Sequence, residues 1–362
     1  MRKTLLYLVI LGLLGFGIYY FLFNNRGSNP YGDAEAGFQV KDTGSIGKIF
    51  IVSNDGESAL IERTDSCWIV NKKYKALPST VNLVLTTLAQ QAPLYPVTQN
   101  AYENVVKTMA TDGIKVELYN RQGKKMKVFY VGGASVNNTG TNMLMEGAKM
   151  PYVVQVPGFV GYVTARYATR LTDWRDRTVF NIPANEIKSI SVQYADKPIN
   201  SFILSRDKDS ITVTADENIM KGLQGQNPHR VRAYLTYFSN VNCEGYLNGL
   251  NDMNAAISTA PKQSTIDVLG IHGQHQRAEI YWLALNKRSK NILTSNADVP
   301  DDYDSDRLYA VINEGRDTVL IQQFAFRNIF HKAYEFFQDS KPHDPKQDQP
   351  RNKTNVMVHK HV

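Results

Sequence analysis

The most chemically suggestive group of side chains in this sequence is an acidic stretch in its second half. Asp302, Asp304 and Asp306 alternate along the chain, and alternating carboxylates offer the hard oxygen ligands that Ca²⁺ prefers. The calcium-loop pattern then stops, because Arg307 stands where a glycine is expected and Asn313 where a glutamate is expected. These aspartates are therefore a weak calcium candidate, and a solvated acidic loop is the favoured interpretation.

Two histidines and two cysteines are the other side chains that could bind a metal or change redox state. His272 and His275 flank a Gly-Gln pair at an expected turn, but no third ligand is near, so an exposed hairpin turn is favoured. Cys67 and Cys243 are too few for a disulfide scaffold or a cysteine-rich zinc module. In an oxidising compartment they could form a disulfide, and buried free thiols are the favoured alternative. The sequence leaves their pairing open.

A short charged segment stands where two similar halves of the chain meet. It consists of Trp174, Arg175, Asp176 and Arg177. The two arginines could bind an anionic partner through their planar guanidinium groups. Ion pairs that fix the two halves against each other, with Trp174 packed between them, are the favoured alternative. We expect this segment to be an interaction site or the junction between the halves.

Sequence motifs for catalysis or cofactor binding are absent from the chain. It contains no Walker loop, G-x-S-x-G elbow, H-E-x-x-H helix or paired Cys-x-x-Cys. Gly132 and Gly133 are interpreted as a turn signal rather than a phosphate cradle. We therefore expect that this protein has no cofactor, no strong metal site and no catalytic residues, and that it is not an enzyme.

The elements that position these residues form two similar halves. Alternating apolar runs beginning at Ile46 and Ile187 each lead to a second alternating run, which is typical of a β-hairpin. Pro78 and Pro228 then begin helical patterns, and further strand pairs follow in each half. We predict an α+β fold of two tandem β-rich repeats, each β-β-α-β-β-β-β-α, with mostly antiparallel sheets and helices on one face.

The first part of the chain predicts a membrane anchor. Residues 4–23 carry no charge, and as a helix they span about 30 Å, the hydrocarbon thickness of a bilayer. Arg2 and Lys3 precede them and Arg26 follows, so the positive-inside bias keeps the N-terminus cytoplasmic. A cleaved signal peptide is the competing interpretation, which the length of the apolar stretch disfavours. We expect a single-pass protein of the cytoplasmic (inner) membrane, with its bulk periplasmic or otherwise extracytoplasmic.

These patterns divide the chain into six parts. Each repeat is expected to close with an aromatic helical segment, over residues 159–171 and 324–337. The C-terminal residues are rich in Pro, Lys, Asp, Gln and His, a composition that cannot bury a core. The expected parts are a cytoplasmic N-terminus (1–3), the transmembrane anchor (4–23), a tether (24–44), the first repeat (45–180), the second repeat (181–337) and a disordered polar tail (338–362).

Composition and charge exclude several classes of protein. The 362 residues are 43% hydrophobic and 21% charged, which is close to the globular average. The net charge of +7 is spread out, because residues 24–180 carry 18 Lys and Arg against 13 Asp and Glu, and residues 181–337 carry 16 against 18. Neither half is strongly basic, so nucleic acid is not an expected partner.

Several of these features together resemble a known bacterial family. They are the membrane segment, the Cys67-Trp-Ile-Val hairpin end, the Gly132-Gly loop, the Tyr152-Val-Val-Gln-Val strand and Trp174-Arg-Asp-Arg. This pattern resembles the family described as domain of unknown function 4340, over roughly residues 45–335. Members are typically membrane-anchored, extracytoplasmic and encoded beside ABC-2-type export systems like those of gliding motility. The resemblance implies an accessory or scaffold role and supplies no catalytic residues.

The sequence thus favours a non-enzymatic, membrane-anchored interaction or scaffold protein of the cell envelope, an accessory component of an ABC-type transport assembly. Its expected partners are the lipid bilayer, through residues 4–23, and a membrane protein such as an ABC-type permease. A glycan- or peptidoglycan-binding envelope protein is the alternative, because Tyr and Trp side chains stack on sugars. An envelope hydrolase is a third interpretation, which the lack of a compact polar cluster disfavours.

Overall fold

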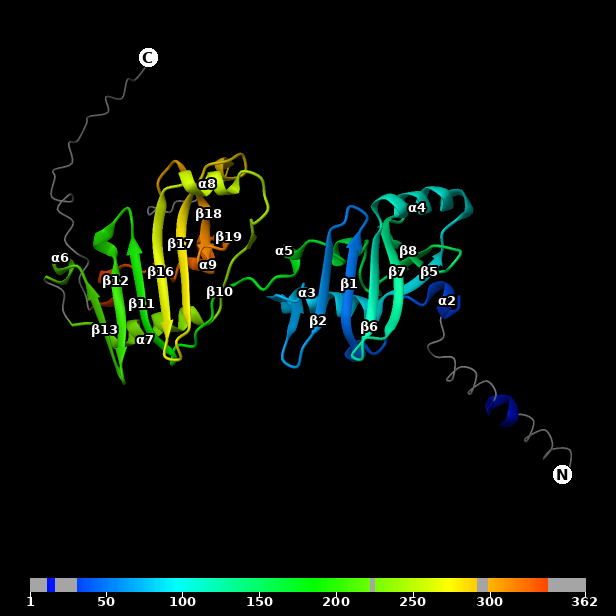
Figure 1. The fold of residues 1–362 in the computed structure, drawn as a ribbon, viewed down its shortest axis with the longest axis horizontal. Helices are drawn as coiled ribbons and strands as arrows, with labels where there is room; N and C mark the ends of the chain where they lie inside the picture. Colours follow the sequence, from blue (N-terminus) through cyan, green and yellow to red (C-terminus); the bar gives the residue numbers. More distant parts are fainter. Residues whose placement is uncertain (1–11, 17–30, 222–224, 292–298, 338–362) are drawn as a thin grey trace, which may run out of the picture. The chain divides into compact units, whose positions relative to one another are not determined.

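The computed structural model describes residues 12–16, 31–221, 225–291 and 299–337 (Figure 1). The chain divides into two compact units, Met1–Asp176 and Arg177–Val362. Each unit contains a large antiparallel β-sheet and a few short helices, which confirms the α+β class predicted from the sequence.

The predicted anchor, residues 4–23, lies outside the described residues except for residues 12–16, which are helical. Among the residues that are described, no helix is both long enough and apolar enough to cross a membrane. The predicted tail, residues 338–362, also lies outside them, as does the beginning of the predicted tether.

The first unit contains a nine-stranded sheet in the order β4-β3-β2-β1-β6-β7-β8-β9-β5, within the described part of the chain. Its strands are β1 (Ile46–Ser53), β2 (Ser58–Arg63), β3 (Trp68–Val70), β4 (Tyr74–Lys75), β5 (Ala92–Pro96), β6 (Ile114–Asn120), β7 (Lys125–Ala134), β8 (Thr141–Met145) and β9 (Tyr152–Gln155). Its helices are α2 (Asp33–Ala36), α3 (Pro78–Gln90), α4 (Gln99–Asp112) and α5 (Leu171–Trp174).

The core of this unit lies between one face of the sheet and helix α3. Pro78 occupies the first turn of α3, where its missing N–H costs nothing, as the sequence predicts. Val81, Val84 and Leu88 follow at helical spacing and are buried against the sheet. Trp174 closes this core, fully buried, and its Nε1 donates to the Ala168 carbonyl at 2.8 Å.

Two sequence interpretations in the first unit are wrong. Gly132 and Gly133 do not form a turn but lie inside strand β7, where a Cβ on Gly132 would come within 2.9 Å of the Met109 side chain of α4. The expected helix over residues 159–171 is a single 3₁₀ turn, Thr164–Arg166. The segment bonds to the sheet instead, because the Val163 backbone N–H donates to Thr141 Oγ1 at 2.7 Å and Thr164 Oγ1 donates to the Gly132 carbonyl at 2.6 Å.

The second unit contains an eight-stranded sheet in the order β13-β12-β11-β16-β17-β18-β19-β15, again counted over the described residues. Its strands are β11 (Ile187–Tyr194), β12 (Phe202–Asp207), β13 (Ser210–Ala215), β15 (Gly245–Tyr246), β16 (Lys262–Gly270), β17 (His275–Ala284), β18 (Tyr303–Ile312) and β19 (Asp317–Gln322). A separate pair joins β10 (Thr178–Phe180) to β14 (Val241–Asn242). The helices are α6 (Glu217–Met220), α7 (Pro228–Thr236), α8 (Met253–Thr259) and α9 (Gln323–Phe326).

Aromatic side chains fill the core between this sheet and its helices. Tyr234 of α7 packs edge-on against Phe202, Phe238 and Phe336, with ring centroids 5.2–5.6 Å apart. The Asn227 side chain caps α7 by accepting from a backbone N–H of its first turn. The expected helix over residues 324–337 is only partly formed, as α9 and a 3₁₀ turn at Ala333–Phe336.

The opposite face of the second sheet carries paired charges. Lys262 Nζ lies 2.7 Å from Glu279 Oε2, and Arg277 bridges Glu279 and Asp267 at 2.9 and 3.0 Å. The Lys262 and Arg277 hydrogen bonds lower the pKa of Glu279 to about 2. Strand alternation explains why these charges share a face, since Ile266 and Val268, which flank Asp267, point into the core on the other side.

We expect Trp174→Ala to destabilise the first unit selectively, by about 3–5 kcal/mol, because it leaves a cavity in that core. Hydrogen exchange followed by mass spectrometry should show faster exchange in β1, β6 and β7 and unchanged exchange in β11, β16 and β17. Trp68→Ala is the matched control, at no more than about 2 kcal/mol, because Trp68 is half-exposed. Equal acceleration in both units would contradict the placement of Trp174 in one core.

We expect Glu279→Gln to lower the free energy of unfolding at pH 7 by less than about 1 kcal/mol, since the pair is partly exposed to solvent. The lowered pKa of Glu279 means that its contribution is present above about pH 4.5 and is lost as the pH falls through about 2. Urea unfolding should therefore show that the difference in free energy of unfolding between the parent protein and the variant becomes smaller as the pH falls through that range. Glu314→Gln, at an exposed turn, is the control variant and should change the free energy of unfolding at pH 7 by less than about 0.5 kcal/mol.

Candidate functional site

A cavity of about 450 Å³ lies at one end of the second sheet. Its walls come from the ends of β11, β16 and β17, the beginning of β18, and helix α9 with the residues that follow it. These segments are far apart in the sequence, and the sheet brings them to one end. This is the cavity around which we build the candidate site.

Aromatic rings form the apolar part of the cavity wall. Trp282 is 5% exposed and stacks on Tyr303, with ring centroids 5.6 Å apart. Tyr194 is held by its hydroxyl, which donates to the His331 carbonyl at 2.9 Å. Phe330 lines the cavity half-buried, whereas Phe324 is 68% exposed at its edge. The cavity therefore offers both a fixed aromatic wall and a solvent-facing ring.

Side-chain amides add hydrogen-bonding groups to this wall. Gln323, the first residue of α9, has a buried Nε2 that donates no hydrogen bond within the described structure. Gln263 is 7% exposed, and its Oε1 accepts from Ser264 Oγ at 2.5 Å. A buried amide N–H without an acceptor costs about 1–3 kcal/mol, so the Gln323 group is suited to an added acceptor.

Three cations surround the opening. Arg327 lies over the Phe324 ring, with its guanidinium carbon 4.3 Å from the ring centroid. Lys197 and Lys332 line the cavity as well. Two acidic residues also line it, Asp306 in β18 and Asp196 just after β11. Within the described residues, neither Lys197 nor Arg327 forms an ion pair with a carboxylate.

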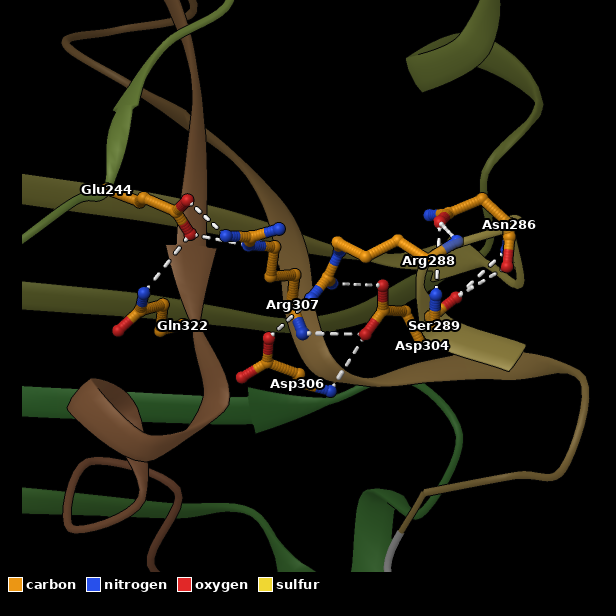
Figure 2. A network of polar contacts seen from close by, with 8 residues as sticks. All are labelled: Glu244, Asn286, Arg288, Ser289, Asp304, Asp306, Arg307 and Gln322. Carbon is orange, nitrogen blue, oxygen red and sulfur yellow. Dashed lines mark hydrogen bonds and ion pairs between the residues drawn. The ribbon is translucent and has the colours of Figure 1, made fainter. Parts of the chain in front are cut away.

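Asp306 shares one arginine with Asp304. Figure 2 shows the Arg288 guanidinium facing two carboxylates at the beginning of β18. Arg288 Nη1 lies 2.9 Å from Asp306 Oδ2, and its Nη2 lies 2.8 Å from Asp304 Oδ2. The other Asp304 oxygen accepts from the backbone N–H of Asp306 and Arg307, at 2.8 and 3.1 Å. These contacts fix the strand that forms one wall of the cavity.

A second charged contact fixes the neighbouring strands. Arg307 Nε donates to Glu244 Oε2 at 2.6 Å, and Gln322 Nε2 donates to the same oxygen at 3.3 Å (Figure 2). Glu244 immediately precedes β15, Arg307 lies in β18 and Gln322 ends β19. The pair therefore joins three adjacent strands beside α9.

The aspartates of the weak calcium candidate are not gathered into a metal site. Asp304 is fully buried and forms an ion pair with Arg288, which also pairs with Asp306. Asp302 is exposed. In the described ranges, no three His, Cys, Asp or Glu side chains lie close enough together to hold a metal ion. The solvated-loop interpretation is also wrong for Asp304 and Asp306, because both belong to strand β18.

The other residues singled out from the sequence lie apart from the cavity. His272 is exposed in the β16–β17 hairpin, and His275 Nε2 lies 2.9 Å from Asp267 Oδ1 on the charged sheet face. Cys67 is half-buried in the first unit and Cys243 is buried in the second, and neither is in a disulfide.

The segment of residues 174–177 spans the division between the two units. Trp174 belongs to the first core, the Arg175 guanidinium carbon lies 3.9 Å from the Tyr74 ring centroid, and Asp176 Oδ2 lies 3.0 Å from Lys75 Nζ. The Arg177 carbonyl accepts from the backbone N–H of Cys243 in the second unit. The role of Arg175, Asp176 and Arg177 as an interaction site stays a prediction.

Sequence reasoning missed the cavity because no short motif carries it. Its amide residues belong to no motif, and Phe324 and Phe330 enter the sequence prediction only as part of an expected helical segment. The available signal was Gln263 at the beginning of strand β16 and Gln323 beside Phe324, because amides that become buried need hydrogen-bond partners. That signal becomes specific only when the sheet order is known.

We expect Arg288→Gln to destabilise the second unit by about 2 kcal/mol, because Asp304 would stay buried without its cation but with its two backbone hydrogen bonds. Arg316→Gln is the matched control, since Arg316 pairs with Glu314 at an exposed turn and should change stability by less than about 0.5 kcal/mol. Urea unfolding measures both variants. Equal small effects would contradict the structural role of Arg288.

Comparisons with known proteins identify a family and no individual relative. The family described as domain of unknown function (DUF4340) matches residues 68–263, which is more than half of the chain. No curated protein and no solved structure matches the sequence or the fold. The matched region runs from strand β3 into strand β16, so it includes parts of both units. The chain therefore belongs to the DUF4340 family.

Proposed function

We propose that this protein is a non-enzymatic interaction protein of the cell envelope, anchored by residues 4–23 and built from two repeated sheet units. In this proposal residues 1–3 are cytoplasmic and both units are extracytoplasmic. The observation that carries it is the sheet face of the second unit that helices leave uncovered. There Ile203 is 46% exposed and Leu269 is 40% exposed.

This uncovered face has the mixed character of a binding surface. Ile203 of β12 and Leu269 of β16 flank Ser191 and Ser189 of the intervening strand β11. The paired charges of Asp267 and Arg277 lie on the same face. Exposed apolar side chains rimmed by polar ones are typical of protein contacts.

The arrangement of the strands supports the repeat. In each unit a hairpin (β2-β1, β12-β11) lies beside four consecutive antiparallel strands (β6 to β9, β16 to β19). A short strand, β5 or β15, then pairs with the last of the four. The register shifts at corresponding places, after Ile46 in β1 and after Ile187 in β11.

A matched arginine in each unit supports the same conclusion. Arg63 Nε donates to the Ile46 carbonyl at 2.9 Å, and its Nη2 donates to the Thr43 carbonyl at 3.2 Å. Arg206 makes the equivalent pair of bonds: its Nε donates to the Ile187 carbonyl at 2.8 Å, and its Nη2 donates to the Ala184 carbonyl at 2.6 Å. In both units the arginine from the second hairpin strand ties down the chain entering the first.

Two similar units on one tether suit a scaffold role, because two linked surfaces raise the effective concentration of whatever binds either one. Family membership supports an accessory role in an envelope transport assembly, as the sequence resemblance implies. We therefore propose a polytopic membrane protein, such as an ABC-type permease, as the partner.

We expect a photo-crosslinking amino acid at position 203 or 269 of the full-length protein to capture one and the same membrane protein in native membranes. Position 237 is the control, because Tyr237 is similarly exposed, at 38%, but lies on the helical side of the sheet. Mass spectrometry of the cross-linked bands identifies the captured protein.

A variant lacking residues 4–23 should stay in the soluble fraction and lose the cross-link. The proposal fails if position 237 captures the same protein as strongly, or if positions 203 and 269 capture none.

A further inference from the structure

We propose that the cavity at the end of the second sheet binds an acidic saccharide, a sugar unit that carries a carboxylate. This inference goes beyond the interaction role proposed above and does not depend on it. It rests on the cavity size, the exposed aromatic ring, the unpartnered amide and the excess of cations at the opening.

The size of the cavity suits a small ligand. Its volume of about 450 Å³ lies within the range of 300–1,000 Å³ typical of small-molecule sites. Trp282 and Tyr194, both less than a tenth exposed, form a wall that packing already holds in place. A ligand would therefore enter a largely preformed site.

The aromatic groups favour a ring-shaped ligand with an apolar face. Phe324 is 68% exposed at the edge of the cavity, so most of its ring surface is open to a ligand. Arg327 covers one side of this ring. A pyranose presents C–H groups on its faces and hydroxyl groups on its edge, so it can pack on Phe324 and Phe330 while its edge stays polar.

The amides supply groups for that polar edge. The buried Gln323 Nε2 lacks an acceptor in the described structure, and a sugar hydroxyl or ring oxygen could provide one. Gln263 and Asn200 line the same cavity, and a side-chain amide can donate and accept at once. Hydroxyl groups have the same dual capacity, which makes the two sets of groups complementary.

The charges distinguish an acidic ligand from a neutral one. The cavity lining has three cations, Lys197, Arg327 and Lys332, against two carboxylates, Asp196 and Asp306, and Asp306 shares Arg288 with Asp304. Lys197 and Arg327 have no carboxylate partner among the residues described. A ligand carboxylate near Arg327 could accept two parallel hydrogen bonds from its guanidinium group.

A second cavity of this unit does not have these features. It has a volume of about 640 Å³ and lies beside β13 and α7. Its Arg206 is committed to two backbone carbonyls, and its Gln226 accepts from the Val213 N–H and donates to the Ile211 carbonyl. These side chains hold the entry to β11 and the edge of β13, so they are not available to a ligand.

The test is calorimetric titration of the full-length protein in detergent with four defined probes. They are N-acetylglucosaminyl-N-acetylmuramic acid, digalacturonic acid, the neutral sugar N,N′-diacetylchitobiose and the acyclic dicarboxylate glutarate. We expect at least one of the two acidic sugars to bind more tightly than about 1 mM, and about tenfold more tightly than either chitobiose or glutarate. Which acidic sugar binds identifies its source, wall glycan or uronic-acid polymer.

Three variants locate the binding. Arg327→Gln should weaken the acidic sugar about tenfold and leave chitobiose unchanged, and Arg327→Lys should restore part of the loss. Phe324→Ala, at an exposed position, should weaken the acidic sugar without lowering the unfolding midpoint. Arg316→Gln is the matched control and should bind like the parent protein.

Three results would overturn the proposal. They are no acidic sugar binding at about 1 mM, chitobiose or glutarate binding as tightly as the acidic sugars, or unchanged affinity in Arg327→Gln. None of them bears on the cross-linking at positions 203 and 269, so the two proposals fail separately.

Discussion

Both units of this protein depend on burying one face of a long antiparallel sheet under few and short helices. Because side chains alternate along a strand, every residue that faces the core places its neighbour on the other side. In β16, Ile266 and Val268 point inward, so Asp267 must point outward, and there Arg277 of β17 pairs both with Asp267 and with Glu279. The uncovered face and its paired charges are therefore consequences of the way the core is built.

Where a carboxylate does point toward the core, the structure pairs it with a cation and with backbone N–H groups. Asp304 is 0% exposed, and Arg288 together with two backbone N–H groups accounts for its oxygens (Figure 2). An uncompensated carboxylate at this depth would cost several kcal/mol. The same arginine also holds Asp306 at the cavity wall, so the charge pairing and the shape of the cavity depend on each other.

The features predicted correctly from the sequence are those with a local signal. Period-two alternation located the strands that begin at Ile46 and Ile187, and proline at the first helical turn located α3 and α7. Helix α4 was missed, because Met109 is the single buried residue of its fourteen and gives no apolar stripe. The short strands β5 and β15 were missed too, since they exist only through pairing with β9 and β19.

The candidate site was beyond sequence reasoning for a related reason. The alternating aspartates indicated an oxygen-rich metal loop, but their charge is met by Arg288, which lies sixteen residues before Asp304 and comes from another segment. Nothing local to the acidic stretch announces that arginine. Likewise the cavity gathers its residues from strand ends whose proximity depends on the order of the sheet.

The proposed repeat also gives a reason why the cavity described here lies in the second unit. The pairing of β1 with β6 and of β11 with β16 places Val116 opposite Ile51, and Ile266 opposite Val192, so the two positions correspond. The next strands, β7 and β17, correspond in the same way, which brings Trp282 to the region of Gly132 and Gly133. In this region the pairing of β7 with β8 and the pairing of β17 with β18 both shift register. Counted from the corresponding residues Phe129 and Ala278, Trp282 takes the place of Gly133, where the first unit has no side chain. In the second unit an indole occupies the corresponding region and forms a cavity wall. On this interpretation the second unit has an indole as a cavity wall where the first has only the backbone of a glycine.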